Sequence, residues 1–295
     1  MRISKIAVVG IAFLCSVAVA QPQPDLWKPV ESALGRSGTM QPDGAYKFGM
    51  PRGDLHVSVG GVAIKAGFAL GSWAAFNKLG SDAMAMGDLV LTEDELTPVV
   101  TKLQQRGIDV TAIHNHLLHE TPRVMYVHFH GHGDAIQIAR ALHDALELTK
   151  TPAQGPPPPP NPPDLGFDQS AVERALGYKG KNNGGVLQFS VPRGEKITSD
   201  GTPIPNSMGL GTAINFQSTS GGKTAITGDF VMIGSEVNQV LAALRAGGVE
   251  VTALHSHMLM EQPRLFFMHF WANDDPAKLA HTLRTALEKM NVKQQ

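Results

Sequence analysis

The sequence has little cysteine, few polar aromatics and no excess of charge of either sign. Its 295 residues include one cysteine, three tryptophans and three tyrosines. A single cysteine excludes a disulfide framework, a thiolate zinc cluster and a redox-active thiol pair. Lysine and arginine number 25 against 26 acidic residues, which leaves a net charge of −1. Since proteins hold nucleic acid through basic surfaces, we expect no nucleic-acid partner.

Histidine, by contrast, is plentiful, with 12 residues. Neutral imidazole binds divalent metals and also transfers protons near neutral pH. If this chain carries out polar chemistry, we therefore expect imidazole to carry it. Hydrophobic residues make up 42% of the chain, enough to build the cores of two domains of ordinary size.

The first 20 residues have the pattern of a secretory signal peptide. Arg2 and Lys5 precede an apolar stretch at 6–19, and Ala18 and Ala20 form a small-x-small cleavage site. The stretch is shorter than the roughly 20 residues that a membrane-spanning helix needs. We therefore expect cleavage after Ala20, export to the periplasm or the exterior, and no stable membrane insertion afterwards. A retained membrane anchor is the alternative.

The rest of the chain repeats itself. Residues 110–130 match residues 251–271 at eleven of 21 positions, with a constant offset of 141. Between the two copies, residues 151–164 are rich in proline and have a composition that cannot bury a core. The sequence therefore predicts repeat 1 over 25–150, a proline-rich linker over 151–164 and repeat 2 over 165–293.

Each repeat alternates helical and strand patterns in the same order. In repeat 1, Thr92 and Glu95 form a capping box before a helix, and Ser235 is the corresponding cap expected in repeat 2. A β-hairpin is predicted over 109–117 and 123–131. This order predicts an α+β fold of two tandem homologous domains, each an antiparallel sheet backed by helices, whose repeats could pack pseudo-symmetrically. The patterns do not determine the strand order.

Three histidines of the hairpin recur in repeat 2. His114 and His116 are two residues apart on a predicted strand, so they leave the same face. If the hairpin pairs His114 with Tyr126, then His128 opposes Ala112 and shares that face, whereas a slip of one residue would move it to the other face. The hairpin residues retained by both repeats are His114, His116, Glu120, Arg123 and His128, which correspond to His255, His257, Glu261, Arg264 and His269.

Three imidazoles from neighbouring strands could bind a divalent metal such as zinc, copper, nickel or manganese, with one position open for water or a small ligand. Glu120 would then be a fourth ligand or a base acting on that water, and Arg123 would hold a carboxylate or phosphate group. The same residues also fit a structural interpretation, with a ladder of histidines and an ion pair at the turn. Whether the repeats make two sites or one shared cleft stays open.

Three segments of repeat 1 resemble the LppY/LpqO-type family. They are GFALGSWAAF at 67–76, MGDLVLTEDE at 86–95 and TAIHNHLLHETPRVMYVHFHGHGD at 111–134. The resemblance implies a domain of unknown function, commonly in two copies, in an exported bacterial protein. It implies no activity, substrate or metal. Repeat 2 departs from the pattern at 207–216, which keeps little of the first segment.

Together these features predict an exported protein that binds a divalent metal or a small ligand at the histidines of each hairpin. Two alternatives remain, a metal-dependent hydrolase or lyase and a structural or interaction protein without a metal. The residues alone do not decide whether the protein is an enzyme.

Overall fold

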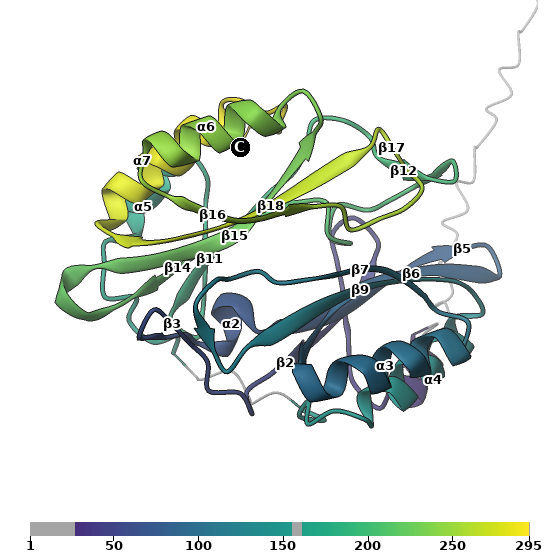
Figure 1. The fold of residues 1–295 in the computed structure, drawn as a ribbon. Helices are drawn as coiled ribbons and strands as arrows, with labels where there is room; N and C mark the ends of the chain where they lie inside the picture. Colours follow the sequence, from purple (N-terminus) through teal and green to yellow (C-terminus); the bar gives the residue numbers. More distant parts are fainter. Residues whose placement is uncertain (1–26, 155–160, 295) are drawn as a thin grey trace, which may run out of the picture.

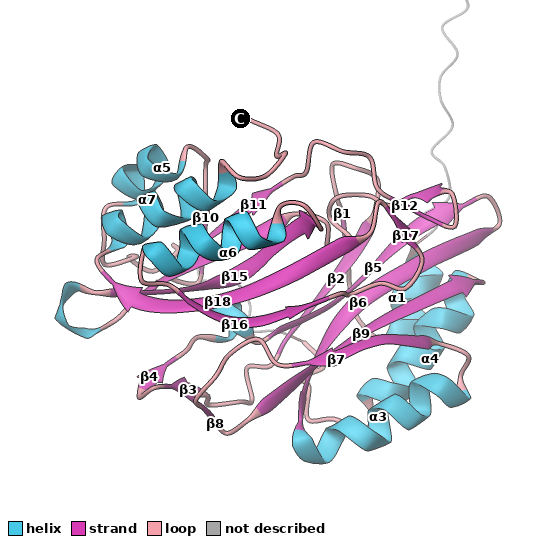
Figure 2. Ribbon diagram, turned by 45° about the horizontal axis from the view of Figure 1, so that its top comes forward, coloured by secondary structure: helices cyan, strands magenta, loops and turns pink. Residues whose placement is uncertain are grey.

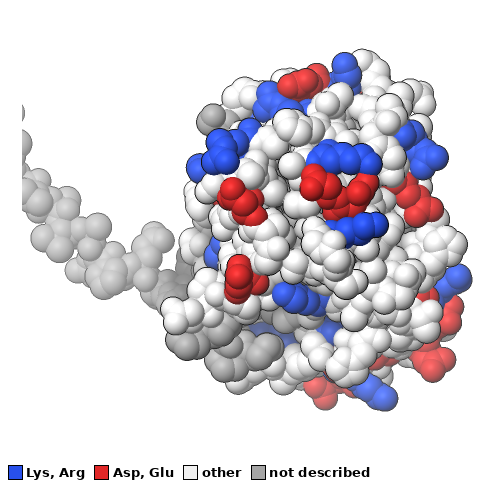
Figure 3. All heavy atoms as spheres, turned by 90° about the vertical axis from the view of Figure 1, so that its left-hand side faces the viewer, with Lys and Arg blue, Asp and Glu red and all other residues white. Residues whose placement is uncertain are grey.

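Figure 1 shows the protein as a computed structural model in which residues 27–154 and 161–294 are described. The expected signal peptide, with Cys15, lies outside the described residues, as do residues 155–160 of the expected linker. Within the described ranges, no helix is both long and apolar enough to cross a bilayer. Acidic and basic side chains lie interspersed on the face seen in Figure 3.

Repeat 1 forms a six-stranded antiparallel sheet in the order β1-β2-β5-β6-β9-β7, with a small sheet β4-β3-β8 beside it. Its elements are α1 (Lys28–Leu34), β1 (Thr39–Met40), β2 (Tyr46–Pro51), β3 (Ser58–Val59), β4 (Val62–Ala63), α2 (Ala66–Ala69), β5 (Gly71–Leu79), β6 (Asp82–Thr92), α3 (Glu93–Gln105), β7 (Asp109–His114), β8 (Glu120–Thr121), β9 (Val124–Gly133) and α4 (Ala135–Leu146).

Repeat 2 has the same topology, with a six-stranded sheet β10-β11-β14-β15-β18-β16 and a small sheet β13-β12-β17. Its elements are α5 (Gln169–Leu176), β10 (Lys181–Asn183), β11 (Val186–Val191), β12 (Thr198–Ser199), β13 (Thr202–Pro203), β14 (Thr212–Ser218), a 3₁₀ turn η1 (Ser220–Gly222), β15 (Thr224–Ile233), α6 (Val237–Ala246), β16 (Glu250–His255), β17 (Glu261–Gln262), β18 (Leu265–Asp274) and α7 (Pro276–Leu287). The predicted α+β fold of two similar antiparallel domains is confirmed.

The two large sheets face each other, and the longer helices cover their outer faces (Figures 1 and 2). Between the sheets, Met84 and Met86 of β6 belong to one buried cluster with Val231 and Phe267 of repeat 2. Because β6 is covered by helices on one side and by repeat 2 on the other, it is buried over almost its whole length. Asp88, only 5% exposed, is the one charged residue in this buried stretch.

The register of the histidine hairpin agrees with the sequence. His114 pairs with Tyr126 and Ala112 with His128, which confirms the predicted pairing. A β-bulge separates Val110 from Ala112 in β7. Strand β7 ends at His114, so the next histidine of the set lies in the loop that follows rather than on the strand.

The start of the long helix differs between the repeats. In repeat 1, Thr92 is the N-cap of α3, and Glu95 accepts a hydrogen bond from its backbone N–H at 2.9 Å. The expectation that Ser235 caps α6 is wrong, because α6 begins at Val237 with Glu236 as its N-cap. Ile233 stands at the position of Thr92 and offers no side-chain oxygen to cap a helix.

A buried ion pair recurs in both repeats and anchors this helix start to the sheet. Arg52 donates to Glu95 at 2.7 Å and to the carbonyl of Val90 at 2.7 Å, and its side chain is fully buried. The corresponding Arg193 donates to Glu236 at 2.8 Å. Both arginines lie in Pro-Arg-Gly segments, at 51–53 and 192–194, and this shared segment therefore has a structural role.

Candidate metal centre

The retained histidines of the two repeats meet in one cluster between the two large sheets. His114 and His255 end β7 and β16, while His128 and His269 lie within β9 and β18. The remaining two occupy the loops after β7 and β16. We call the six residues the histidine cluster: His114, His116, His128, His255, His257 and His269.

The cluster has pseudo-twofold symmetry. The rings of the equivalent residues His114 and His255 lie with centroids 3.8 Å apart and are tilted by 35°. His116 stacks on His269 at 3.8 Å, and exchange of the repeats turns this contact into the stacking of His257 on His128, at 3.6 Å. An approximate twofold axis therefore passes between His114 and His255, as in a dimer with an isologous interface. The histidines thus form one shared cluster instead of two separate groups.

Two aspartates that sequence reasoning missed complete the cluster. Asp88 on β6 pairs across the sheet with His128, and its carboxylate oxygens lie 3.8 Å from His128 Nε2 and 3.7 Å from His116 Nε2. Asp229 on β15 makes the same approach to His257, at 3.7 Å. A usable signal was present in the sequence, because both repeats keep Gly-Asp within an otherwise apolar strand.

Many polar atoms of the cluster are buried without a hydrogen-bond partner. An unsatisfied buried polar group costs about 1–3 kcal/mol. Separations of 3.7–3.8 Å between nitrogen and carboxylate oxygen are too long for hydrogen bonds. They do suit two ligands of one ion, which stand roughly 3–4 Å apart when each bond is about 2.1 Å. Among the described residues the unpartnered cluster atoms are Asp88 Oδ1, Asp229 Oδ1, His114 Nδ1, both ring nitrogens of His255, and Nε2 of His116, His128 and His257.

Burial keeps the imidazoles neutral. Loss of water lowers the pKa of every histidine in the cluster, to about 4 for His255 and about 3 for His269. Positive charge on neighbouring histidines lowers the pKa of His114 further. Burial also raises the pKa of Asp88 to about 7 and that of Asp229 well above its usual value. Neutral imidazole is the form that binds metals, and a bound cation would favour the ionised carboxylates.

Two groups of nitrogen donors are close enough to share an ion, each with its ligand atoms within 4.8 Å of one another. Imidazole nitrogen with nearby carboxylate suits zinc, copper or nickel, and more carboxylate-rich coordination suits manganese. Both groups include His114. One consists of His114, His116 and His128, and the other of His114, His255, His257 and His269.

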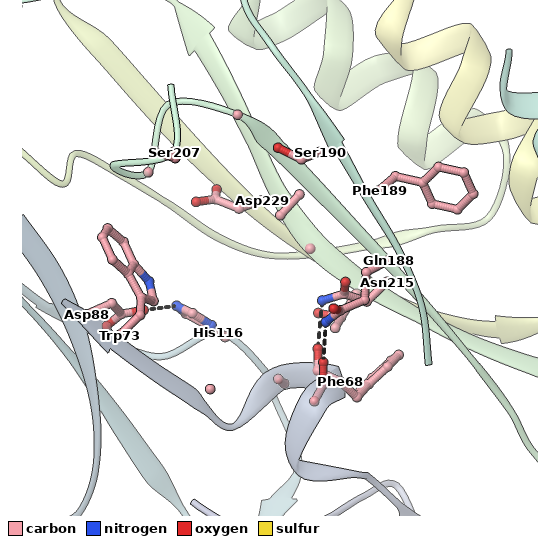
Figure 4. A pocket seen from close by; sticks show the side chains of 18 of the residues that line it. Phe68, Trp73, Asp88, His116, Gln188, Phe189, Ser190, Ser207, Asn215 and Asp229 are labelled. Atoms are coloured by element: carbon pink, nitrogen blue, oxygen red, sulfur yellow. Dashed lines mark hydrogen bonds and ion pairs between the residues drawn. The ribbon is translucent and has the colours of Figure 1, made fainter. Parts of the chain in front are cut away.

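A cavity of about 580 Å³ opens onto the cluster. Asp88, His116 and His128 line it from repeat 1. The corresponding residues Asp229, His257 and His269 line it from repeat 2. Figure 4 shows the Asp88–His116 pair beside Trp73, with Asp229 on the neighbouring sheet. Five residues with unpartnered atoms therefore border the cavity, while His114 and His255 lie behind its wall.

Glu120 and Arg123, the residues expected to act as base and anion holder, lie elsewhere. Glu120 begins the short strand β8 and accepts hydrogen bonds from the backbone N–H of Val124 at 3.1 Å and from Asn115 at 3.3 Å. Arg123 is exposed. In the described part of the chain, neither residue lines the cavity or belongs to the groups of potential ligands. In repeat 2, Arg264 donates to Glu261 at 3.3 Å.

The comparisons with known proteins show a family and no activity. No curated protein matches the sequence. The trimeric bacterial microcompartment shell protein PduB aligns with a TM-score of 0.23 and 10% identity, over 87% of this chain and 96% of its own. The structure of EtuB from Clostridium kluyveri aligns with a TM-score of 0.20 and 9% identity, over 85% of this chain and 88% of its own. The model of a family described as Domain of Unknown Function (DUF1259) matches residues 28–148 and 170–289, and the chain therefore belongs to this family and contains its domain twice.

Proposed function

We propose that the protein binds a divalent transition-metal ion in the histidine cluster, with ligands from both repeats. The observation that carries the proposal is the convergence of six neutral imidazoles and two carboxylates, all of which except His269 carry a buried polar atom without a hydrogen-bond partner. Histidines that only braced the two sheets would be expected to donate to and accept from nearby groups. A metal ion would satisfy several of these atoms at once.

The donor set favours particular metals. Imidazole nitrogen predominates over carboxylate oxygen in the cluster, which favours zinc, copper or nickel over manganese. Because ligands from both repeats surround the same space, a bound ion would also join the repeats. Metal affinity would then add to the stability of the folded protein, since the unfolded chain does not hold a preformed site.

Element analysis tests the proposal. Protein purified without a histidine tag is expected to contain about one ion per chain, or to take up one ion on dialysis against zinc, copper, nickel or manganese. His114→Ala should reduce the bound metal strongly, because this residue belongs to both groups of donors. His281→Ala, at an exposed position of α7, is the matched control and should bind as the wild type does.

Failure would also be informative. A protein without stoichiometric metal, and with no thermal shift on adding any of the four metals, would contradict metal binding. The alternative of a structural or interaction protein would then remain. Its histidines would contribute only to the packing of the two sheets.

A metal-dependent hydrolase or lyase is the second candidate. The observation that favours it is the cavity that opens onto Asp88 and the neighbouring histidines. A carboxyl group whose pKa is raised to about 7 has the right proton affinity for a general base at neutral pH. Hydrolysis of chromogenic esters or phosphoesters by metal-loaded protein, abolished by chelation, would support this candidate. Activity that survives full removal of metal would contradict it.

We also propose that the chain is exported as an LppY/LpqO-type protein. Support comes from the basic, apolar and small-residue pattern of residues 1–20. Expression of the full gene product in a bacterium, followed by amino-terminal sequencing of the periplasmic fraction, is expected to begin at Gln21. A product that keeps Met1 and stays in the cytoplasm would contradict export.

A further inference from the structure

We infer that the cavity beside the histidine cluster binds a small organic anion, which Lys47 and Trp73 of repeat 1 recognise. The inference goes beyond metal binding. The cavity and both side chains are formed by the protein alone, so anion binding is testable with or without an ion in the cluster.

Lys47 is a cation with unused hydrogen-bonding capacity at the cavity wall. Its ammonium group lies 4.3 Å from the centre of the Trp73 ring and donates to the carbonyl of Ser207 at 2.9 Å. An ammonium group has three N–H donors, and Ser207 supplies its sole hydrogen-bond acceptor among the described residues. Burial lowers the pKa of Lys47 to about 8, which leaves the charged form predominant at neutral pH, while nearby Asp43 acts in the opposite direction.

Two lysines give the cavity wall positive charge that an anion can contact. Apart from histidine, its charged lining residues are Lys47, Lys181, Asp88 and Asp229. Both aspartates face histidines of the cluster, whereas the ammonium group of Lys47 contacts the Trp73 ring and the carbonyl of Ser207. A metal ion in the cluster would add further positive charge.

The size of the cavity points to an organic molecule rather than a bare ion. Its volume of about 580 Å³ falls within the range of roughly 300–1,000 Å³ found for small-molecule sites. Trp73 adds aromatic surface to its wall, while Asn215 and Gln188 add polar groups. An anion with a short carbon skeleton could contact the lysine through its charged group and Trp73 through its apolar part.

The repeat fold does not require a lysine and a tryptophan at these positions. Lys47 stands beside Ala75 in the β2–β5 ladder, and the matching place in the β11–β14 ladder, beside Asn215, is taken by Gln188. Trp73 pairs with Asp88, and Ala213 makes the equivalent pair with Asp229. Since repeat 2 forms the same sheet with glutamine and alanine, the lysine and the tryptophan are not needed to build the sheet.

Tryptophan fluorescence offers a direct test. Trp73 is one of three tryptophans, so Trp73→Phe identifies its share of the emission. The probes are acetate, succinate and phenylphosphonate, with uncharged succinamide as the matched control for succinate. Each is titrated into chelator-treated and zinc-loaded protein up to about 10 mM, well above a Kd of about 1 mM for a weak complex. We expect a saturable change in Trp73 emission with at least one anion and none with succinamide.

Variants then assign the binding to Lys47. Lys47→Gln copies the residue that repeat 2 carries at the matching position and should bind the anion at least tenfold more weakly. Lys47→Arg keeps the positive charge and should retain binding. Lys289→Gln removes an exposed lysine at the end of α7 and should change nothing.

Three results would overturn the inference. They are the absence of saturable binding by all three anions, equal binding of succinamide and succinate, and undiminished binding by folded Lys47→Gln. Should Lys47→Gln fail to fold, the wild-type comparison of succinate with succinamide decides the question. Because chelator-treated protein is titrated too, loss of the proposed metal site would leave this test intact.

Discussion

The rings of His114 and His255 lie with their centroids 3.8 Å apart, tilted by 35°, across the contact between the two repeats, and each residue is the counterpart of the other. The duplicated chain therefore brings two copies of one hairpin face to face, much as a symmetric dimer would. The donor group of His114, His255, His257 and His269 draws on both repeats. Binding at the cluster and packing of the repeats are, on this account, a single property of the molecule.

Substitution of a cluster aspartate should have opposite effects with and without metal. Burial raises the pKa of Asp88 to about 7, so above that pH its charge destabilises the metal-free protein. Asp88→Asn removes the charge, and we expect the metal-free free energy of unfolding at pH 8 to rise by at least about 1 kcal/mol. The zinc-induced rise in Tm should shrink, because an ionised ligand is lost. Thermal unfolding with chelator and with zinc measures both effects, and an unchanged zinc response would contradict a role in metal binding.

The metal-free protein should be labile to acid. The folded pKa values of the cluster histidines lie below the unfolded value of 6.5, so the unfolded chain binds more protons. Their contribution to stability is complete above about pH 6.5 and is lost as pH falls through the folded values. Asp88 acts the other way, since its contribution is complete below about pH 3.8 and is lost as pH rises through about 7.

Six histidines outweigh two aspartates, so the net stability should fall toward acid, with each group contributing up to about 1.4 kcal/mol per pH unit. Urea unfolding in chelator at pH 7.5, 6.5 and 5.5 measures this slope. A stability that stays level or rises between pH 7.5 and pH 5.5 would show that the histidines are not buried in neutral form.

We expect the buried pairs of arginine and glutamate to stabilise the fold and to have no part in metal binding. Arg52→Met leaves the Glu95 carboxylate buried without its charged partner, which typically costs about 3–5 kcal/mol. Arg193→Met should do the same in repeat 2. Arg174, whose side chain is 73% exposed and 4.0 Å from Asp168, is the matched control, and Arg174→Met should cost less than about 0.5 kcal/mol. Urea unfolding gives the three values, and similar costs for Arg52→Met and Arg174→Met would contradict the structural role.

We expect Glu120 to stabilise the segment between β7 and β9 and to have no part in metal binding. Its carboxylate accepts from the backbone N–H of Val124, so Glu120→Ala leaves that donor without its acceptor and should cost about 1–3 kcal/mol. Glu120→Gln keeps an acceptor oxygen and should cost less. Both variants should retain the metal content of the wild type by element analysis. Loss of metal from folded Glu120→Gln would instead make this residue a ligand, as the sequence pattern allowed.

Local features of this fold could be predicted from the sequence because short-range rules determine them. The pairing of His114 with Tyr126 followed from the hairpin turn, and the capping box at Thr92 followed from residue spacing. Comparison of the repeats separated three histidine pairs from the other six histidines. The prediction for the start of α6 was wrong because Glu236, held by Arg193, occupies the N-cap position, and its side chain makes no capping hydrogen bond.

Contacts between strands that are far apart in the chain could not be predicted from these short-range rules. Asp88 lies next to His128 because β6 pairs with β9, two strands far apart in the chain. No turn specifies that pairing. The contact between the two hairpins depends likewise on which apolar sheet faces pack together. Met84 and Phe267 belong to one buried cluster, but this packing is seen only in the folded protein. Asp88 carried a signal all the same, as a carboxylate inside a buried strand that both repeats keep.

Anomalous diffraction from crystals of metal-loaded protein would locate a metal centre that draws ligands from both repeats. We expect an anomalous peak between the two large sheets, about 2.0–2.2 Å from nitrogens of His114 and of at least one histidine of repeat 2. A peak ligated by one repeat alone, a peak outside the histidine cluster, or no peak in crystals soaked with zinc would contradict a shared metal centre.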